Sequence, residues 1–266
     1  MGHRRHAHPR PALITLAAAL VAGVLVAGAA GCGAAAPQPA APAPAPATPA
    51  LSPTATPPSP TLTSTVSPSA APAAAPFAHS IATLSRARRA AMIKSGSWSP
   101  RCPVALDDLR LVTLTYWGFD GRRHTGRLVV NRDAVAAIVG ALSRLYRDRF
   151  PIRRMTPVDA YGASDERSME ADNTSAFNGR FVAGSHVWSQ HAFGRALDLD
   201  PLENPEIRDG KVYPTNAKRY ADRTLGLPGM IVAGGPVVRA FAAVGWGWGG
   251  TWHSPRDYQH FSASGS

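Results

Sequence analysis

The chain has 266 residues, and its 28 Lys and Arg residues against 17 Asp and Glu give it a formal net charge of +11. Two cysteines are too few for a disulfide framework or a thiolate zinc site, so a metal would need His and carboxylate ligands. From residue 77 onward the formal charge is +8, from 25 basic and 17 acidic residues. This excess indicates anionic polymers or anionic lipid headgroups as partners, unless the arginines only solvate the surface.

The first 31 residues have the pattern of an export signal. Residues 1–10 carry three arginines and no acid, residues 11–30 are almost purely apolar, and Gly31-Cys32 follows. This pattern predicts a signal peptide over residues 1–31. The sequence from Ala29 to Cys32 resembles a bacterial lipobox, which predicts lipidation of Cys32. A retained N-terminal membrane helix and plain secretion are the two alternatives. An exported chain has little access to nucleic acid, so we expect none as a partner.

Residues 32–76 predict a disordered tether. After Cys32 the segment consists mainly of Ala, Pro, Ser and Thr, without a charged residue. Such a composition buries too little apolar surface to offset chain entropy. With about 3.1 Å per residue in polyproline geometry, the tether could reach on the order of 100 Å. The folded domain is therefore expected over residues 77–266, outside the cytoplasm, tethered to the bacterial membrane or secreted to the cell wall.

The first half of this domain predicts two helices and a hairpin. Helical spacing of apolar residues indicates a basic amphipathic helix over His79–Lys94, which Gly96 ends. Leu109–Trp117 and Thr125–Val130 are rich in β-branched and aromatic residues and flank a turn at Asp120-Gly121, as in a hairpin. Asn131 is expected to cap a helix that runs to about Arg149. Residues 155–184 are irregular in pattern.

The second half predicts short elements separated by loops. Residues 195–200 alternate like a strand, with Asp198 and Asp200 on one side. A loop hairpin over 204–216, a short helix begun by Pro236, an aromatic glycine-rich loop over 245–252 and a last strand over 258–262 follow. The sequence thus predicts an α+β fold with a small antiparallel sheet flanked by helices, and we expect a monomer.

Two short motifs carry the chemistry. Ser189-Gln-His-Ala-Phe-Gly-Arg-Ala-Leu-Asp198 and Asp257-Tyr-Gln-His260 together supply two imidazoles and two carboxylates. His191, Asp198 and His260 could hold one zinc ion on neighbouring strands and leave a coordination position for water. Asp257 could then serve as the base. An offset of three residues would point Asp257 away from His260 on a straight strand, so we expect a turn or bulge at Asp257-Tyr258.

The spacing Ser189-x-His191-x-x-Gly194-x-Ala196-x-Asp198, followed by Asp257-x-x-His260, resembles a known family. This is the D-alanyl-D-alanine carboxypeptidase and L-alanyl-D-glutamate endopeptidase family of zinc metallopeptidases (VanY-like, in the fold group with lysostaphin and the hedgehog signalling domain). The resemblance extends over about residues 151–261 and includes Asn173-Thr-Ser-Ala-Phe-Asn178, Arg180 and Trp246-Gly-Trp-Gly-Gly250. It implies a zinc peptidase that acts on peptidoglycan stem peptides.

The resemblance also implies roles for single residues. His191, Asp198 and His260 would hold Zn²⁺, Asp257 would be the general base, and Arg180 would steady the carbonyl oxygen or a substrate carboxylate. Ser189 resembles a family serine that can bond substrate, with loop capping as its alternative. His253, which follows Trp252 and lies close to the motif in sequence, is a further candidate for lining the substrate. The bond that is cut, D-Ala–D-Ala or L-Ala–D-Glu, stays open, and a catalytically silent wall-binding or signalling module is the rival function.

Overall fold

The computed structural model describes residues 76–266. The predicted signal peptide, Cys32 and nearly all of the predicted tether lie outside the described residues. From Pro76 to the end of the chain, no helix is long and apolar enough to cross a membrane.

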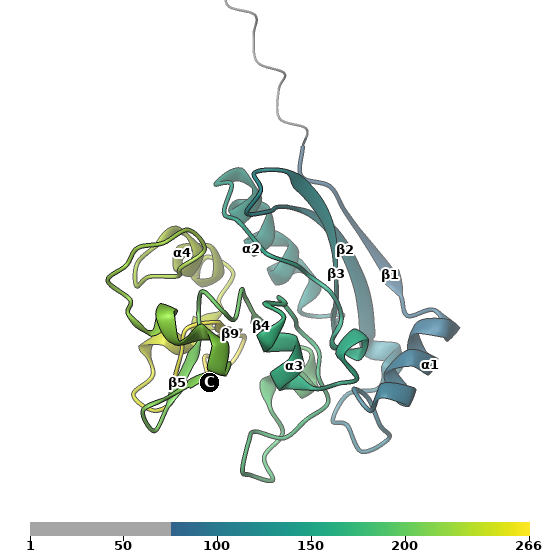
Figure 1. Ribbon diagram of the computed structural model, residues 1–266. Coiled ribbons are helices and arrows are strands. Elements are labelled where there is room, and N and C mark those ends of the chain that lie inside the picture. Colours follow the sequence, from purple (N-terminus) through teal and green to yellow (C-terminus); the bar gives the residue numbers. More distant parts are fainter. Residues whose placement is uncertain (1–75) are drawn as a thin grey trace, which may run out of the picture. The chain divides into compact units, whose positions relative to one another are not determined.

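A three-stranded antiparallel sheet opens the described chain (Figure 1). Its strands, in the order β1-β2-β3, are His79–Thr83, Leu109–Trp117 and Arg123–Asn131. The predicted hairpin is confirmed, since β2 pairs with β3 over its full length. The prediction of a helix over His79–Lys94 is wrong in its first half, because residues 79–83 pair with the edge of β2. Only α1, Arg86–Ser95, is helical; Ser85 caps its start, and Gly96 ends it with a φ of +82°.

Helix α2, Val135–Arg147, begins later than predicted. Asn131 is not its cap, since it ends β3, and its side-chain amide donates to the carbonyl of Phe193. The apolar face of α2 covers β2, which buries Ile138, Leu142 and Leu145. On another side α2 packs against α4, Pro236–Ala242, the short helix that the sequence predicted.

The segment predicted to be irregular contains a 3-10 helix, Val158–Tyr161, and one short α-helix. Helix α3, Asp165–Glu170, begins at Ser164, whose hydroxyl accepts a hydrogen bond from the backbone N–H of Arg167. Serine at this position is a typical helix N-cap. The remaining residues around α3 form turns and extended segments.

Two further three-stranded antiparallel sheets follow, so the described residues form three small sheets where the sequence predicted one. The first has the order β4-β9-β7, with Ala196–Asp198, His260–Ser262 and Gly247–Trp248. The second has the order β6-β5-β8, with Lys211–Tyr213, Glu206–Arg208 and Arg256–Asp257. The fold class α+β is confirmed.

The β4-β9-β7 sheet is anchored in the main hydrophobic core. Phe261, fully buried on β9, stacks on Phe241 of α4 with ring centroids 4.0 Å apart. Its neighbour Leu197 on β4 is equally buried. Because side chains alternate along a strand, the residues flanking these two point to the other face. Asp198 and His260 are such residues, and the core thus fixes the strands that carry them.

Candidate metal centre

Three elements converge on one buried group of side chains. His191 lies in a 3-10 turn, Gln190–Phe193, while Asp198 ends β4 and His260 begins β9. Asp198 and His260 stand directly opposite each other in the antiparallel register. On its other side the backbone of Asp198 exchanges two hydrogen bonds with Ser175. Asp198 is therefore held from both sides.

Local sequence explains the position of His191. The hydroxyl of Ser189 accepts a hydrogen bond from the backbone N–H of His191 and so caps the turn at its start. Gly194 ends the turn with a φ of +66°, and a Cβ there would lie 2.6 Å from the backbone nitrogen of Asn131. Only glycine meets both demands without strain. The Gly194 carbonyl also accepts from the Asn131 N–H, which docks the turn onto β3.

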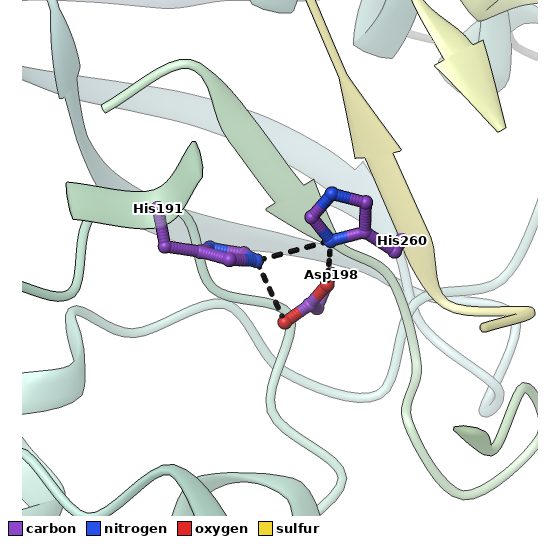
Figure 2. Close-up of side chains that lie close together, drawn as sticks. All are labelled: His191, Asp198 and His260. Atoms are coloured by element: carbon purple, nitrogen blue, oxygen red, sulfur yellow. Dashed lines mark hydrogen bonds and ion pairs between the residues drawn. The ribbon is translucent and has the colours of Figure 1, made fainter. Parts of the chain in front are cut away.

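One nitrogen of each imidazole and the carboxylate of Asp198 form a triangle, in which the two nitrogens approach different carboxylate oxygens (Figure 2). Nε2 of His191 lies 3.1 Å from Oδ2 of Asp198 and 3.2 Å from Nδ1 of His260. Nδ1 of His260 lies 3.0 Å from Oδ1 of Asp198. All three residues are at most 6 % exposed. Zinc bonds of 2.0–2.1 Å would separate tetrahedral ligand atoms by about 3.3 Å, so the observed spacing is close to that of a zinc site.

Hydrogen bonding alone leaves this triangle incomplete. Nδ1 of His191 lies 2.5 Å from the carbonyl oxygen of Ala176, so this nitrogen carries the proton. In neutral His191 the Nε2 lone pair then faces Asp198 and His260. An imidazole oriented by a backbone carbonyl is a common arrangement in zinc sites. A metal ion or an extra proton between this lone pair and the carboxylate of Asp198 would remove the repulsion between them, and the donor set fits zinc.

The close approach of the three side chains also shifts the pKa values of Asp198 and His191. Burial opposes ionisation of Asp198, but the imidazoles of His191 and His260 hold the pKa of its carboxyl below its usual range. Burial also disfavours a charged His191, yet the carboxylate of Asp198 outweighs it and raises the pKa of His191. The group therefore attracts positive charge.

Asp257 lies beside this group on β8. Bends at Tyr258 and Gln259 separate β8 from β9, which confirms the expected break in the strand. Oδ1 of Asp257 is buried and has no hydrogen-bond partner among the described residues. Burial, followed by the charge of Asp198, raises the pKa of Asp257 to about 8. A carboxyl with a buried, unpartnered oxygen and a raised pKa has the properties of a general base or acid.

Arg180 faces the same group but is partly engaged. Its Nη2 lies 2.7 Å from Oδ2 of Asp165 on α3, so the ion-pair alternative is present in the structure. Its Nε is buried and has no partner in the part of the chain that the structure describes. Burial would lower the pKa of Arg180, but Asp165, Asp198 and Asp257 together raise it. Arg180 can thus hold its ion pair and still donate from Nε.

A segment of the chain that contains most of this site matches the model of a known peptidase family. Residues 183–263 match the family model described as D-alanyl-D-alanine carboxypeptidase. The resemblance predicted from the sequence is confirmed over this segment, which is less than a third of the chain. It contains the three residues of the candidate metal centre and Asp257, whereas Arg180 precedes it. The match indicates a peptidase. Comparisons with curated proteins and with solved structures give no match.

Other candidates of the carboxypeptidase-like segment lie less centrally. Ser189 is buried and caps the turn, which is the structural alternative foreseen for it. His253 is exposed in the loop before β8. Substrate contact stays a prediction for both residues. Asp200, two residues after Asp198, makes no hydrogen bond to either imidazole among the described residues; its Oδ1 accepts from the backbone N–H of Arg153 at 2.8 Å.

Sequence reasoning missed three contributors to the site. Ala176 orients His191 only through its carbonyl, which no residue type reveals. Asp165 pairs with Arg180 across 15 residues, and its sequence signal is that of an ordinary first-turn acid after Ser164. Glu206 stands opposite Asp257 in the β5-β8 pair. Glu206 reaches Asp257 only because the β5-β6 hairpin packs beside β8 in this register, which the sequence does not reveal.

A second group of buried acids, Asp172 and Glu203, surrounds Arg153. Glu203 is 2 % exposed, and its Oε2 is buried without a partner among residues 76–266. Its Oε1 accepts from the hydroxyl of Tyr220 at 3.4 Å. Burial, followed by the charge of the neighbouring Asp172, raises the pKa of Glu203 to about 8. Arg153 lies close to both acids.

Replacing Glu203 with Gln is expected to change how stability depends on pH. Because the folded-state pKa of Glu203 exceeds the unfolded value of 4.5, the folded state holds the proton more tightly, and stability falls as pH rises from about 4.5 to about 8. Gln keeps the shape without the charge. The free energy of unfolding of the variant relative to wild type should therefore rise between pH 5 and pH 8 by roughly 1–4 kcal/mol.

Urea unfolding at both pH values measures this difference. The exposed Glu170→Gln on α3 is the matched control and should show no such trend. A difference that is flat across this range in Glu203→Gln would show that Glu203 is ionised throughout.

Proposed function

We propose that the chain is an exported zinc peptidase that hydrolyses peptide bonds in the stem peptides of bacterial peptidoglycan. The observation that carries the proposal is the convergence of His191, Asp198 and His260 within 3.0–3.2 Å of one another. The match to D-alanyl-D-alanine carboxypeptidases over residues 183–263 supports the reaction class. The export signal of the sequence supports an extracytoplasmic location.

Each group of the site has a role in this reaction. His191, Asp198 and His260 would hold zinc, which lowers the pKa of a water molecule toward neutrality and polarises the scissile carbonyl. Asp257 accepts a proton from the attacking water and returns it to the leaving amine. Arg180, through its unpaired Nε, donates a hydrogen bond to the oxyanion as charge develops there. The products are a carboxylate and a free amine.

The arrangement favours an enzyme over a silent binding module. A module that only binds the wall gains nothing from a carboxyl with a buried, unpartnered oxygen beside three metal-ligand side chains. Such a group is costly to keep, since burying a polar atom without a hydrogen bond lowers stability. Its retention is expected where it transfers a proton.

Incubation with defined stem peptides tests the function. The purified chain loaded with zinc is expected to release either D-Ala from a D-Ala–D-Ala terminus or L-Ala from an L-Ala–D-Glu bond. Mass spectrometry of the products identifies the bond. Chelation should abolish turnover, and added zinc should restore it. Turnover that survives complete removal of metal would refute the zinc mechanism, and no cleavage of either bond by the zinc-loaded chain would refute the proposed substrate class.

A further inference from the structure

One face of the β6-β5-β8 sheet carries a row of functional groups next to the candidate metal centre. Glu206 on β5 stands opposite Tyr213 on β6 and opposite Asp257 on β8. Directly opposed residues share a face of the sheet, and so do residues two apart on one strand. Arg208 therefore lies on the face that carries Glu206 and Asp257. Arg256, which is opposite Ile207, lies on the reverse face.

Arg208 is held in place without being buried. Its Nη1 lies 3.5 Å from Oε1 of Glu206, and its guanidinium carbon lies 4.8 Å from the centre of the Tyr213 ring. The Arg208 side chain is 31 % exposed, while that of Glu206 is 15 % exposed. A guanidinium has five N–H donors in one plane, so this single long ion pair leaves donors for a ligand. Stacking on an aromatic ring fixes that plane.

The row is electrostatically continuous with the metal centre. Burial raises the pKa of Glu206, Arg208 opposes this, and the charge of Asp198 adds to it. Glu206 also adds to the rise in the pKa of Asp257. Glu206, which holds Arg208, stands directly opposite Asp257 in the β5-β8 pair, so Arg208 is held beside the proposed base. The guanidinium of Arg180, which is proposed to serve the oxyanion, is already paired through Nη2 with Asp165 at 2.7 Å.

We propose that Arg208 is a specificity-determining residue that binds a carboxylate of the substrate beside the scissile bond. The inference rests on the proposed function and adds the chemical class of a subsite to it. The planar fork of arginine matches a carboxylate with two parallel hydrogen bonds. The ring of Tyr213 stacks on one face of the guanidinium, and Glu206 pairs with its Nη1. The outward edge of Arg208 receives the substrate carboxylate.

Matched peptides test the subsite. The probe is a stem pentapeptide, L-Ala–γ-D-Glu–L-Lys–D-Ala–D-Ala, with two analogues in which either the α-carboxylate of D-Glu or the C-terminal carboxylate is a primary amide. The zinc-loaded chain should prefer the free acid over one of the amides by about 10- to 100-fold in kcat/KM, the loss expected for a charge-assisted hydrogen bond. The amide that is discriminated against identifies the carboxylate. Arg208→Gln should reduce this ratio to near one through a higher KM for the free acid.

The controls separate the subsite from general charge. Arg256→Gln removes the same charge from the reverse face and should keep the preference, and Arg208→Lys should keep part of it. Thermal unfolding of each variant checks folding. Calorimetric binding of the intact pentapeptide to the Asp257→Asn chain, with and without Arg208→Gln, gives a readout independent of turnover and should show the same 10- to 100-fold loss.

The outcomes are distinct for the two proposals. Failure of the wild-type chain to cleave any stem peptide overturns the proposed function. Cleavage without a preference between acid and amides, or a preference that survives Arg208→Gln, overturns the subsite alone. Equal loss in Arg256→Gln would also overturn it, since the effect would then come from the net charge.

Discussion

Asp257→Asn is expected to lower kcat by about 10²- to 10⁴-fold, the range that general-base catalysis contributes, while zinc binding is unchanged. The reason is that Asp257 stands beside the metal centre without belonging to its triangle of donor atoms. Asn keeps the size and polarity of the side chain but cannot accept the proton. A stopped assay on the pentapeptide measures kcat, and metal analysis of the same sample measures zinc content.

Asp209→Asn is the matched control for this variant. Asp209 is exposed in the turn between β5 and β6 with a φ of +50°, a conformation that Asn tolerates well. This control should keep wild-type turnover. Full turnover in Asp257→Asn would remove Asp257 from the mechanism, and loss of zinc in that variant would instead make Asp257 part of the metal centre.

The pH profile gives the same prediction a second measurement. A base must be ionised to accept a proton, so activity is lost as pH falls below the pKa of Asp257. Burial and the charge of Asp198 raise that pKa to about 8, and a divalent cation beside Asp198 would lower it toward neutrality. The wild-type acidic limb is expected between these limits. Asp257→Asn should lose this limb in its residual activity.

The sequence predicted the local elements where strong patterns exist. The β2-β3 hairpin and α4 follow from β-branched runs, a turn and a proline at a helix start. The prediction failed at His79–Thr83, because these residues alone fit a helical pattern as well as an edge strand. Residues 79–83 form a strand because they pair with the free edge of β2. The local sequence carries no signal for this pairing.

The site was predictable in its donors and not in its surroundings. Residue types and spacing made His191, Asp198 and His260 possible ligands, and the family resemblance predicted that they converge, as the structure shows. Ala176 reaches the site through its backbone carbonyl, and Asp165 reaches it through an ion pair with Arg180. Glu206 is placed there by the register of β5 with β8. Such contacts depend on how separate elements pack. The sequence offers no period or motif for them.

Replacing His260 with Ala is expected to weaken zinc binding by more than about 100-fold and to abolish turnover. Loss of a residue that only orients a ligand already costs about 10- to 100-fold in affinity, and His260 is itself a ligand in the proposed site. Titration with zinc followed by calorimetry measures the affinity. His186→Ala is the matched control, since His186 is exposed and its ring packs edge-on against Phe181, outside the metal centre. It should bind zinc as the wild type does.

Thermal unfolding distinguishes a metal centre from a hydrogen-bonded trio. If zinc binds the folded chain alone, zinc at 100 times its dissociation constant adds about 2.7 kcal/mol of stability, and Tm should rise by roughly 5–10 °C. If a proton instead joins the three side chains, zinc must displace it and should add little at low pH and more at high pH. In His260→Ala, the rise should vanish at every pH, because Asp198 and His191 alone leave the ion half-coordinated. A Tm that rises equally in wild type and variant would place the bound zinc elsewhere, since this gain requires Nδ1 of His260.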